Sequence, residues 1–182
     1  MPVALEPIGI VHSCFKEKFG IPRQAGLVRE ARATLELLPP FNRPEAVRGL
    51  ESFSHIWIVF IFHAHCRQSW KPTVRPPRLG GNRRMGVFAS RSGFRPNPLG
   101  ISAVELAALR FPDNRVVLDI RGGDLLDGTP VVDIKPYLPY ADSRPAAGTG
   151  YAPAPLDIRL PVIFSSRAQA ACRRLRPADG SD

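Results

Sequence analysis

The chain has 182 residues, of which 44% are hydrophobic and 23% charged, and its net charge is +9. This composition is typical of a soluble globular domain with one hydrophobic core. The charge favours an anionic partner, with nucleic acid ahead of a membrane surface. Cys14, Cys66 and Cys172 lie far apart and form no C-x-x-C pair, which favours a reducing cytoplasm and argues against a disulfide framework. No apolar run is long enough to span a membrane, and no secretory signal is seen.

Short segments rich in β-branched residues follow one another, separated by many of the 20 prolines and 15 glycines. They predict strands at 8–12, 34–38, 55–62, 85–89, 101–109, 115–120 and 131–134. Helix signals are few and predict a short helix over 42–50 and a last helix over 167–175. The chain lacks a strand-G-x-G-x-x-G-helix unit. We therefore expect a mainly β fold, a small antiparallel barrel or sandwich outside the Rossmann class.

The run over 86–102, G-V-F-A-S-R-S-G-F-R-P-N-P-L-G-I-S, is unlike a core segment. Its two prolines fix the backbone and its glycines allow close approach of a ligand. Arg91 and Arg95 offer forked donors suited to carboxylate or phosphate. The run predicts a preorganised binding loop, the alternative being a stiff surface connection. For the turn signal Asp127-Gly128-Thr129-Pro130, the residues alone leave open whether it meets a ligand.

The positive charge is concentrated between residues 67 and 95, and no Asp or Glu occurs between Glu51 and Glu105. A solvated surface usually mixes charges of both signs, so this segment predicts contact with nucleic acid rather than a basic loop without function. The candidate RNA-binding residues are Arg67, Lys71, Arg75, Arg78, Arg83, Arg84 and Arg95.

Other candidate chemistries are weaker. His63 and His65 lie two apart beside Cys66, but no compact third ligand is visible, so we expect no metal. Ser90, Ser92 and Ser102 lie in no nucleophile motif. Asp124, Asp127 and Asp133 are close in sequence, which does not establish their separation in space.

Five segments of the chain resemble the motifs of a known protein family. They are K-E-K-F-G-I-P-R-Q at 16–24, F-S-H-I-W at 53–57, R-P-P-R-L-G-G at 75–81, the 86–102 run, and D-G-T-P-V-V-D-I-K-P-Y at 127–137. In this order they resemble the bacterial tRNA threonylcarbamoyladenosine N6-methyltransferase family (TrmO, TsaA-like), over roughly residues 6–140.

The resemblance implies a non-Rossmann β-barrel methyltransferase that binds S-adenosylmethionine. It implies a homodimer that methylates N6 of threonylcarbamoyladenosine beside the anticodon, in the tRNA anticodon stem-loop. The implied cofactor contacts are Arg23, Gln24, Ala25, His63, Ala64, Arg91, Ile101, Asp127, Gly128, Thr129 and Pro130.

The resemblance also bears on domain organisation. We expect a catalytic barrel over 1–142, a Pro/Ala/Gly-rich arm or linker over 143–160, and the truncated start of a C-terminal region over 161–182.

Methylation of an N6–H that is conjugated to a carbonyl requires removal of a proton. Asp133, Tyr137 and His63 are the candidate bases, and the sequence does not choose among them. The alternative function from another class is a non-enzymatic RNA-binding β-barrel module, in which Trp70, Phe88 and Phe94 stack on bases.

Overall fold

The computed structural model describes residues 3–65, 69–154 and 161–175. The chain forms two compact units, Met1–Ala152 and Pro153–Asp182. The first contains every strand found in these ranges, and the second contains helix α2 (Ser166–Leu175). The predicted boundaries at residues 142 and 160 stay predictions.

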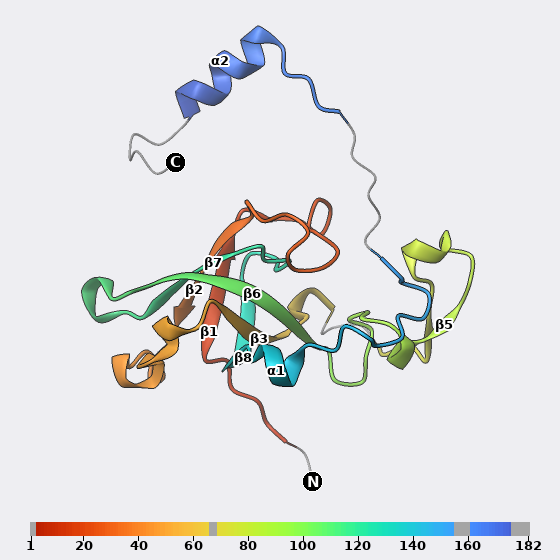
Figure 1. The fold of residues 1–182 in the computed structure, drawn as a ribbon, viewed down its shortest axis with the longest axis horizontal. Helices are drawn as coiled ribbons and strands as arrows, with labels where there is room; N and C mark the ends of the chain where they lie inside the picture. Colours follow the sequence, from red (N-terminus) through yellow and green to blue (C-terminus); the bar gives the residue numbers. More distant parts are fainter. Residues whose placement is uncertain (1–2, 66–68, 155–160, 176–182) are drawn as a thin grey trace. The chain divides into compact units, whose positions relative to one another are not determined.

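Six antiparallel strands of the first unit close into a barrel in the order β1-β2-β7-β6-β3-β8, with β8 pairing back to β1 (Figure 1). They are β1 (Gly9–Ser13), β2 (Arg32–Leu37), β3 (His55–Ile61), β6 (Leu99–Arg110), β7 (Val117–Arg121) and β8 (Thr129–Pro136). Closure gives every strand two partners, so the sheet has no free edge. The prediction of a mainly β chain built on a small antiparallel barrel is confirmed.

Strand β3 shows how the sequence fills the barrel. Its side chains alternate, with Ile56, Ile58 and Phe60 buried and the residues between them more exposed. The strand predicted over 55–62 is thus β3, which lies between β6 and β8 with one face in the core. Residues from every barrel strand complete that core, among them Val11, Leu35, Val104, Leu118 and Val131.

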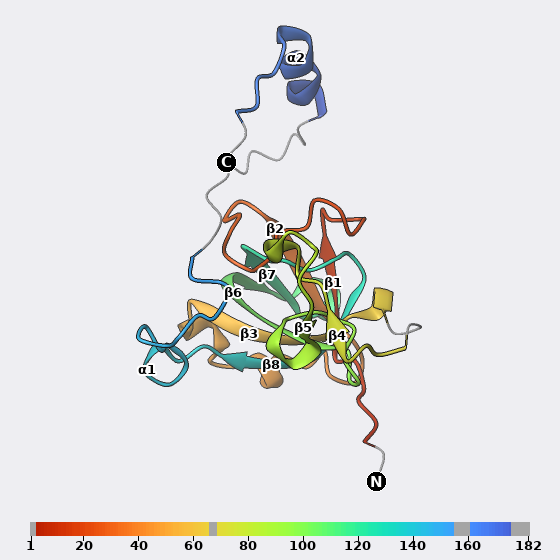
Figure 2. The ribbon, with the colours of Figure 1, turned by 90° about the vertical axis from the view of Figure 1, so that its right-hand side faces the viewer.

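A smaller two-stranded sheet, β4 (Thr73–Val74) with β5 (Met85–Gly86), lies outside the barrel (Figure 2). The sequence predicted one strand over 85–89 and missed β4. The strand ends at Gly86, and Val87–Ala89 form the 3₁₀ helix η5, where Ser90 Oγ donates to the Val87 carbonyl at 2.9 Å.

The helix predicted over 42–50 is instead two short 3₁₀ helices, η1 (Pro44–Val47) and η2 (Leu50–Ser52). Gly49 separates them with a φ of 87°, in the left-handed region that glycine favours. The remaining short helices are η3 (His63–His65), η4 (Pro77–Leu79), η6 (Pro112–Asn114) and α1 (Pro139–Asp142). Across the described ranges, no helix has the length and apolar character to cross a membrane.

Candidate functional site

A cavity of about 450 Å³ lies beside the end of β3 and the start of β6. Four parts of the chain line it: residues 18–24 after β1, residues 60–64, residues 90–102 and residues 124–129. Its volume is within the range of small-molecule sites in proteins. The barrel thus brings the P-R-Q segment, the binding loop and the turn before β8 to one place.

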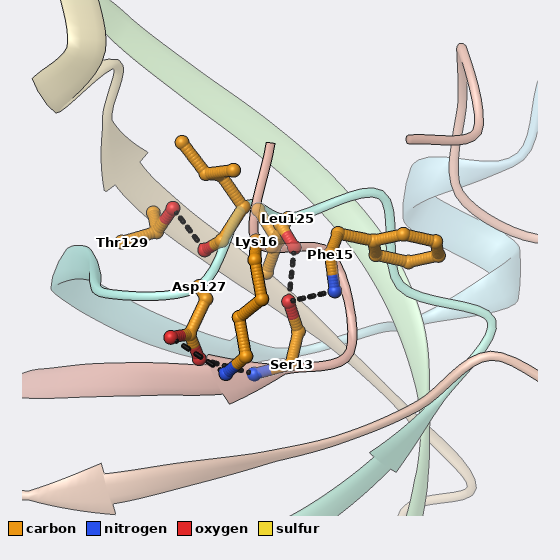
Figure 3. Close-up of polar contacts among 7 residues, drawn as sticks. Ser13, Phe15, Lys16, Leu125, Asp127 and Thr129 are labelled. Carbon is orange, nitrogen blue, oxygen red and sulfur yellow. Dashed lines mark hydrogen bonds and ion pairs between the residues drawn. The ribbon is translucent and has the colours of Figure 1, made fainter. Parts of the chain in front are cut away.

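The 127–130 turn is tied to the loop that follows β1 (Figure 3). The Ser13 N–H donates to Asp127 Oδ1 at 2.9 Å, and Lys16 Nζ lies 2.7 Å from Asp127 Oδ2. The Asp127 N–H donates to the Phe15 carbonyl at 2.8 Å, and Ser13 Oγ donates to the Leu125 carbonyl at 2.9 Å. The hydrogen bond from Lys16, followed by that from Ser13, lowers the pKa of Asp127. The Asp127 carboxylate therefore binds the protein itself and is not among the cavity-lining residues.

Within the same turn, only Thr129 lines the cavity. Gly128 has a φ of 75°, and Thr129 begins β8 with an exposed fraction of 3%. Thr129 Oγ1 donates to the Leu126 carbonyl at 2.6 Å and closes the turn. Pro130 lies in β8 opposite Ile10. The implied cofactor contacts Asp127, Gly128 and Pro130 thus surround the cavity wall without lining it.

Among the described residues that line the cavity, Asp124 is the one with a carboxylate side chain. Ser102 on β6 is 4% exposed, and its Oγ donates to Asp124 Oδ1 at 2.6 Å. Burial raises the pKa of Asp124, against the lowering effects of the Ser102 hydrogen bond, the Ala25 N–H and the Arg91 charge. The site therefore holds a partly desolvated carboxyl group within the electrostatic reach of an arginine.

The binding loop and the P-R-Q segment meet at the cavity. Arg91 Nη1 donates to Gln24 Oε1 across 67 residues of sequence. Seven of the implied cofactor contacts line the cavity. They are Thr129, described above, and Arg23, Gln24, His63, Ala64, Arg91 and Ile101. Ala25 is not among the lining residues, and its N–H has a small lowering effect on the pKa of Asp124.

Internal hydrogen bonds hold the binding loop in shape. Arg95 Nη1 donates to the carbonyls of Ser90 at 2.7 Å and Val87 at 3.2 Å, and its guanidinium lies 5.5 Å from the Phe88 ring centroid. The Phe62 N–H donates to the Pro98 carbonyl at 2.7 Å, which joins the loop to the end of β3. Arg95, predicted to bind RNA, thus lines the cavity and supports the loop.

An aromatic pair forms an apolar wall of the cavity. The rings of Phe60 and Phe62 lie edge to face with centroids 5.0 Å apart. Gly93 and Gly100 lie against these rings, where a Cβ would collide with them. Both glycines of the binding loop therefore make room for aromatic side chains.

The three candidate bases are not together. His63 lines the cavity. Asp133 is not among the lining residues, and its Oδ2 lies 3.0 Å from Lys135 Nζ. Tyr137 is also absent from the lining and packs against Trp57, at the far end of β3, with ring centroids 5.5 Å apart.

The predicted RNA-binding residues lie mostly around the small β4–β5 sheet. Lys71 Nζ sits 4.4 Å from the Phe94 ring centroid, and the backbones of these two residues are hydrogen-bonded. Arg75, Arg83 and Arg84 are exposed, Arg78 is partly buried, and Arg67 lies outside the described residues. Nowhere in the described part of the chain do three His, Cys, Asp or Glu side chains come together as a metal site.

Sequence reasoning missed Ser102 and Asp124 as partners. The sequence presents Ser102 only as a possible nucleophile and Asp124 only as one of three nearby carboxylates. A signal is present, since Ser102 is a polar residue at an inward position of an alternating strand. Its partner cannot be found from spacing, because β7 and the turn after it separate the two residues.

The fold and the cavity define a small β-barrel protein with a cavity of a size suited to a small molecule, distinct from doubly wound nucleotide-binding folds. A profile of the tRNA-methyltransferase O N-terminal domain family matches residues 10–143. The chain belongs to this family, and the predicted family is confirmed.

Individual relatives agree with the family match. The tRNA (adenine(37)-N6)-methyltransferase of Escherichia coli K12 is 54% identical over 164 residues, which are 90% of this chain and 70% of the relative. A Pseudomonas aeruginosa protein, RcsF, with the provisional name of S-adenosylmethionine-dependent methyltransferase, is 54% identical over 85% of this chain and 65% of its own length. The crystal structure of TrmO from Pseudomonas aeruginosa superposes with a TM-score of 0.70 at 48% identity, over 85% of this chain and 65% of that one. The chain thus spans 65% to 70% of the length of these relatives.

Proposed function

We propose that this chain is an S-adenosylmethionine-dependent methyltransferase that acts on N6 of threonylcarbamoyladenosine next to the anticodon of tRNA. The observation that carries the proposal is the cavity, which gathers Arg23, Gln24, His63 and Arg91 from three segments of the family domain. The names of the relatives support both the methyl donor and the tRNA substrate.

The residues of the cavity fit this cofactor. Its volume suits a small molecule, and its lining combines the Phe60–Phe62 wall with arginine and carboxylate groups. When bound, S-adenosylmethionine supplies an activated methyl group on a sulfonium centre between an adenosine and an α-amino acid. Arg23, Gln24 and Arg91 would hold its polar ends, and Ile101 and the aromatic wall would pack on its apolar surface.

The protein contributes to the rate mainly by positioning and by excluding water. The loop that carries Arg91 is fixed by the Arg95 hydrogen bonds, and the turn before β8 is fixed by Thr129. A preformed site loses little entropy when its ligands bind. This rigidity is what a bimolecular methyl transfer needs to align donor and acceptor.

His63 is the proposed proton acceptor. The N6–H of the substrate is conjugated to a carbonyl, so its nitrogen is a poor nucleophile until the proton leaves. His63 lines the cavity, whereas Asp133 and Tyr137 do not. Imidazole is the side-chain group best suited to take up a proton at neutral pH.

The exposed basic residues around β4 and β5 would bind phosphates of the anticodon stem-loop. Lys71, Arg75, Arg83 and Arg84 belong to a segment without acidic side chains, so their charges add. We further propose a homodimer in the cytoplasm, where the tRNA substrate is found. Light scattering during gel filtration would test the dimer.

The experiment that tests cofactor binding is calorimetric titration of the purified chain with S-adenosylmethionine. Near-stoichiometric binding that Arg91→Ala weakens, with an unchanged melting temperature, supports the methyltransferase. Arg110→Ala is the matched control, because Arg110 pairs with Asp119 on β7 and does not line the cavity. No binding by the wild-type chain, with tRNA affinity intact, would favour the RNA-binding module instead.

A further inference from the structure

The cavity lining contains one negative side chain among several positive ones. Asp124 is the carboxylate of the described lining, and Arg91 is near enough for its charge to act on it. The other charged side chains that line the cavity, Lys18, Arg23 and Arg95, are cationic. A site built only for an anionic ligand gains nothing from a buried carboxylate, so Asp124 indicates a ligand that also carries a positive group.

Asp124 is held in place. Its Oδ1 accepts a 2.6 Å hydrogen bond from Ser102, a side chain with an exposed fraction of 4%. The Ala25 N–H, directly after the P-R-Q segment, adds a smaller lowering effect on the pKa of Asp124. The Ser102 hydrogen bond thereby joins the segment before β8 to strand β6. Such anchoring fixes the position of the charge before any ligand arrives.

We propose that Asp124 and Arg91 form a zwitterion clamp for the α-amino acid end of the cofactor, with Asp124 accepting from the α-ammonium group and Arg91 donating to the carboxylate. This inference rests on the proposed function, since it assumes that the cavity takes S-adenosylmethionine. An α-amino acid carries one positive and one negative charge on a single carbon, so its binding site needs one group of each sign close together. The cavity provides this pair, and the burial of Asp124 makes a charge-assisted hydrogen bond to its carboxylate stronger than in water.

The burial of Asp124 agrees with this role. Desolvation raises the pKa of Asp124, which means that ionisation of this carboxyl group is unfavourable in the protein without ligand. An ammonium ion that binds to the carboxylate offsets that cost. Asp124 would therefore stabilise the bound cofactor more than the folded chain alone.

The test compares three ligands by calorimetry. S-adenosylmethionine has both charged groups of the amino acid, decarboxylated S-adenosylmethionine keeps only the ammonium, and methylthioadenosine has neither. Asp124→Asn is expected to weaken the first two by about 10- to 100-fold, the loss of one charge-assisted hydrogen bond, and to leave methylthioadenosine unchanged. Arg91→Gln is expected to weaken S-adenosylmethionine similarly and to leave the decarboxylated ligand unchanged. Only the clamp predicts that the Asp124 variant weakens both ligands with an ammonium group while the Arg91 variant weakens only the ligand with a carboxylate.

Other results would overturn the clamp, and they distinguish its failure from failure of the proposed function. Equal affinity of Asp124→Asn and wild type for S-adenosylmethionine overturns the clamp and leaves the proposed function standing. An equal loss for methylthioadenosine also overturns it, because Asp124 would then support the nucleoside site or the cavity shape. A wild-type chain that binds none of the three ligands overturns both proposals. Circular dichroism melts check that each variant is folded.

Ser102→Ala provides a second variant if Asp124→Asn does not fold. It keeps the carboxylate and removes its anchoring hydrogen bond. A several-fold loss of S-adenosylmethionine affinity, without loss for methylthioadenosine, is expected. Unchanged affinity for S-adenosylmethionine would overturn the clamp.

Discussion

Gly100 lies directly against the ring of Phe60, its partner across the β3–β6 ladder. A Cβ on residue 100 would stand 2.6 Å from Phe60 Cε2 and 2.9 Å from Cε1. These distances are far below an ordinary carbon contact, so any larger side chain must displace the ring. The wall of the cavity therefore depends on the absence of a side chain at this position.

Gly100→Ala is expected to lower the free energy of unfolding by about 1–3 kcal/mol, the usual effect of an overpacked site, and to weaken cofactor binding with it. Urea denaturation and calorimetric titration measure the two effects. Gly86→Ala is the matched control, since a Cβ there meets nothing within 4 Å and its φ is not positive. Equal stability of the two variants would contradict the packing argument.

Asp127 makes a pH-dependent contribution to stability. Its pKa is lowered in the folded state, first by the Lys16 hydrogen bond, so its stabilising effect is present above the unfolded pKa of about 3.9. That effect is lost as the pH falls through the lower folded pKa. Asp127→Asn should therefore be less stable than wild type at neutral pH and equally stable in strong acid.

Urea unfolding across this pH range measures the Asp127 effect. Asp113→Asn is the control, because Asp113 has a side chain that is 89% exposed and a φ of 48° that asparagine tolerates. A constant difference between Asp127→Asn and wild type at every pH would show that the carboxylate charge is not responsible.

The fold was predictable where the sequence pattern is local. The strands predicted over 55–62 and 115–120 correspond to β3 and β7. The boundary between β5 and η5 was not predictable from β propensity, because the Ser90 hydrogen bond to Val87 turns the chain there.

The site was predictable only in part. Arg91 and Gln24 were selected by their motifs and do meet in space. The Asp127 carboxylate instead binds Lys16 and Ser13, and the Ser102–Asp124 pair arises from barrel closure, which residue spacing does not encode.

His63→Asn is expected to reduce the rate of methyl transfer by about 100-fold or more at saturating cofactor, since a general base acts in the chemical step. Single-turnover kinetics with saturating cofactor measure this rate. Asp133→Asn and Tyr137→Phe serve as controls and should retain near wild-type rates. A slow Tyr137→Phe beside a normal His63→Asn would reverse the assignment of the base.

Arg83→Gln combined with Arg84→Gln is expected to weaken tRNA binding and to reduce its dependence on salt. The log of the affinity falls with the log of the salt concentration, and removal of one phosphate interaction makes this negative slope shallower by about 0.7 to 0.9. Arg43→Gln with Arg48→Gln removes the same charge from the η1 region outside the basic segment and is the matched control. Filter binding at several salt concentrations compares the pairs, and equal slopes would contradict the proposed RNA surface.

Methyl transfer itself tests the central claim most directly. The purified chain is incubated with S-adenosylmethionine and tRNA that carries threonylcarbamoyladenosine, and the digested nucleosides are analysed by mass spectrometry. The proposed function predicts a methyl group on N6 of that nucleoside, and none on tRNA that lacks the threonylcarbamoyl group. A chain that binds both cofactor and tRNA but leaves the nucleoside unmethylated would contradict it.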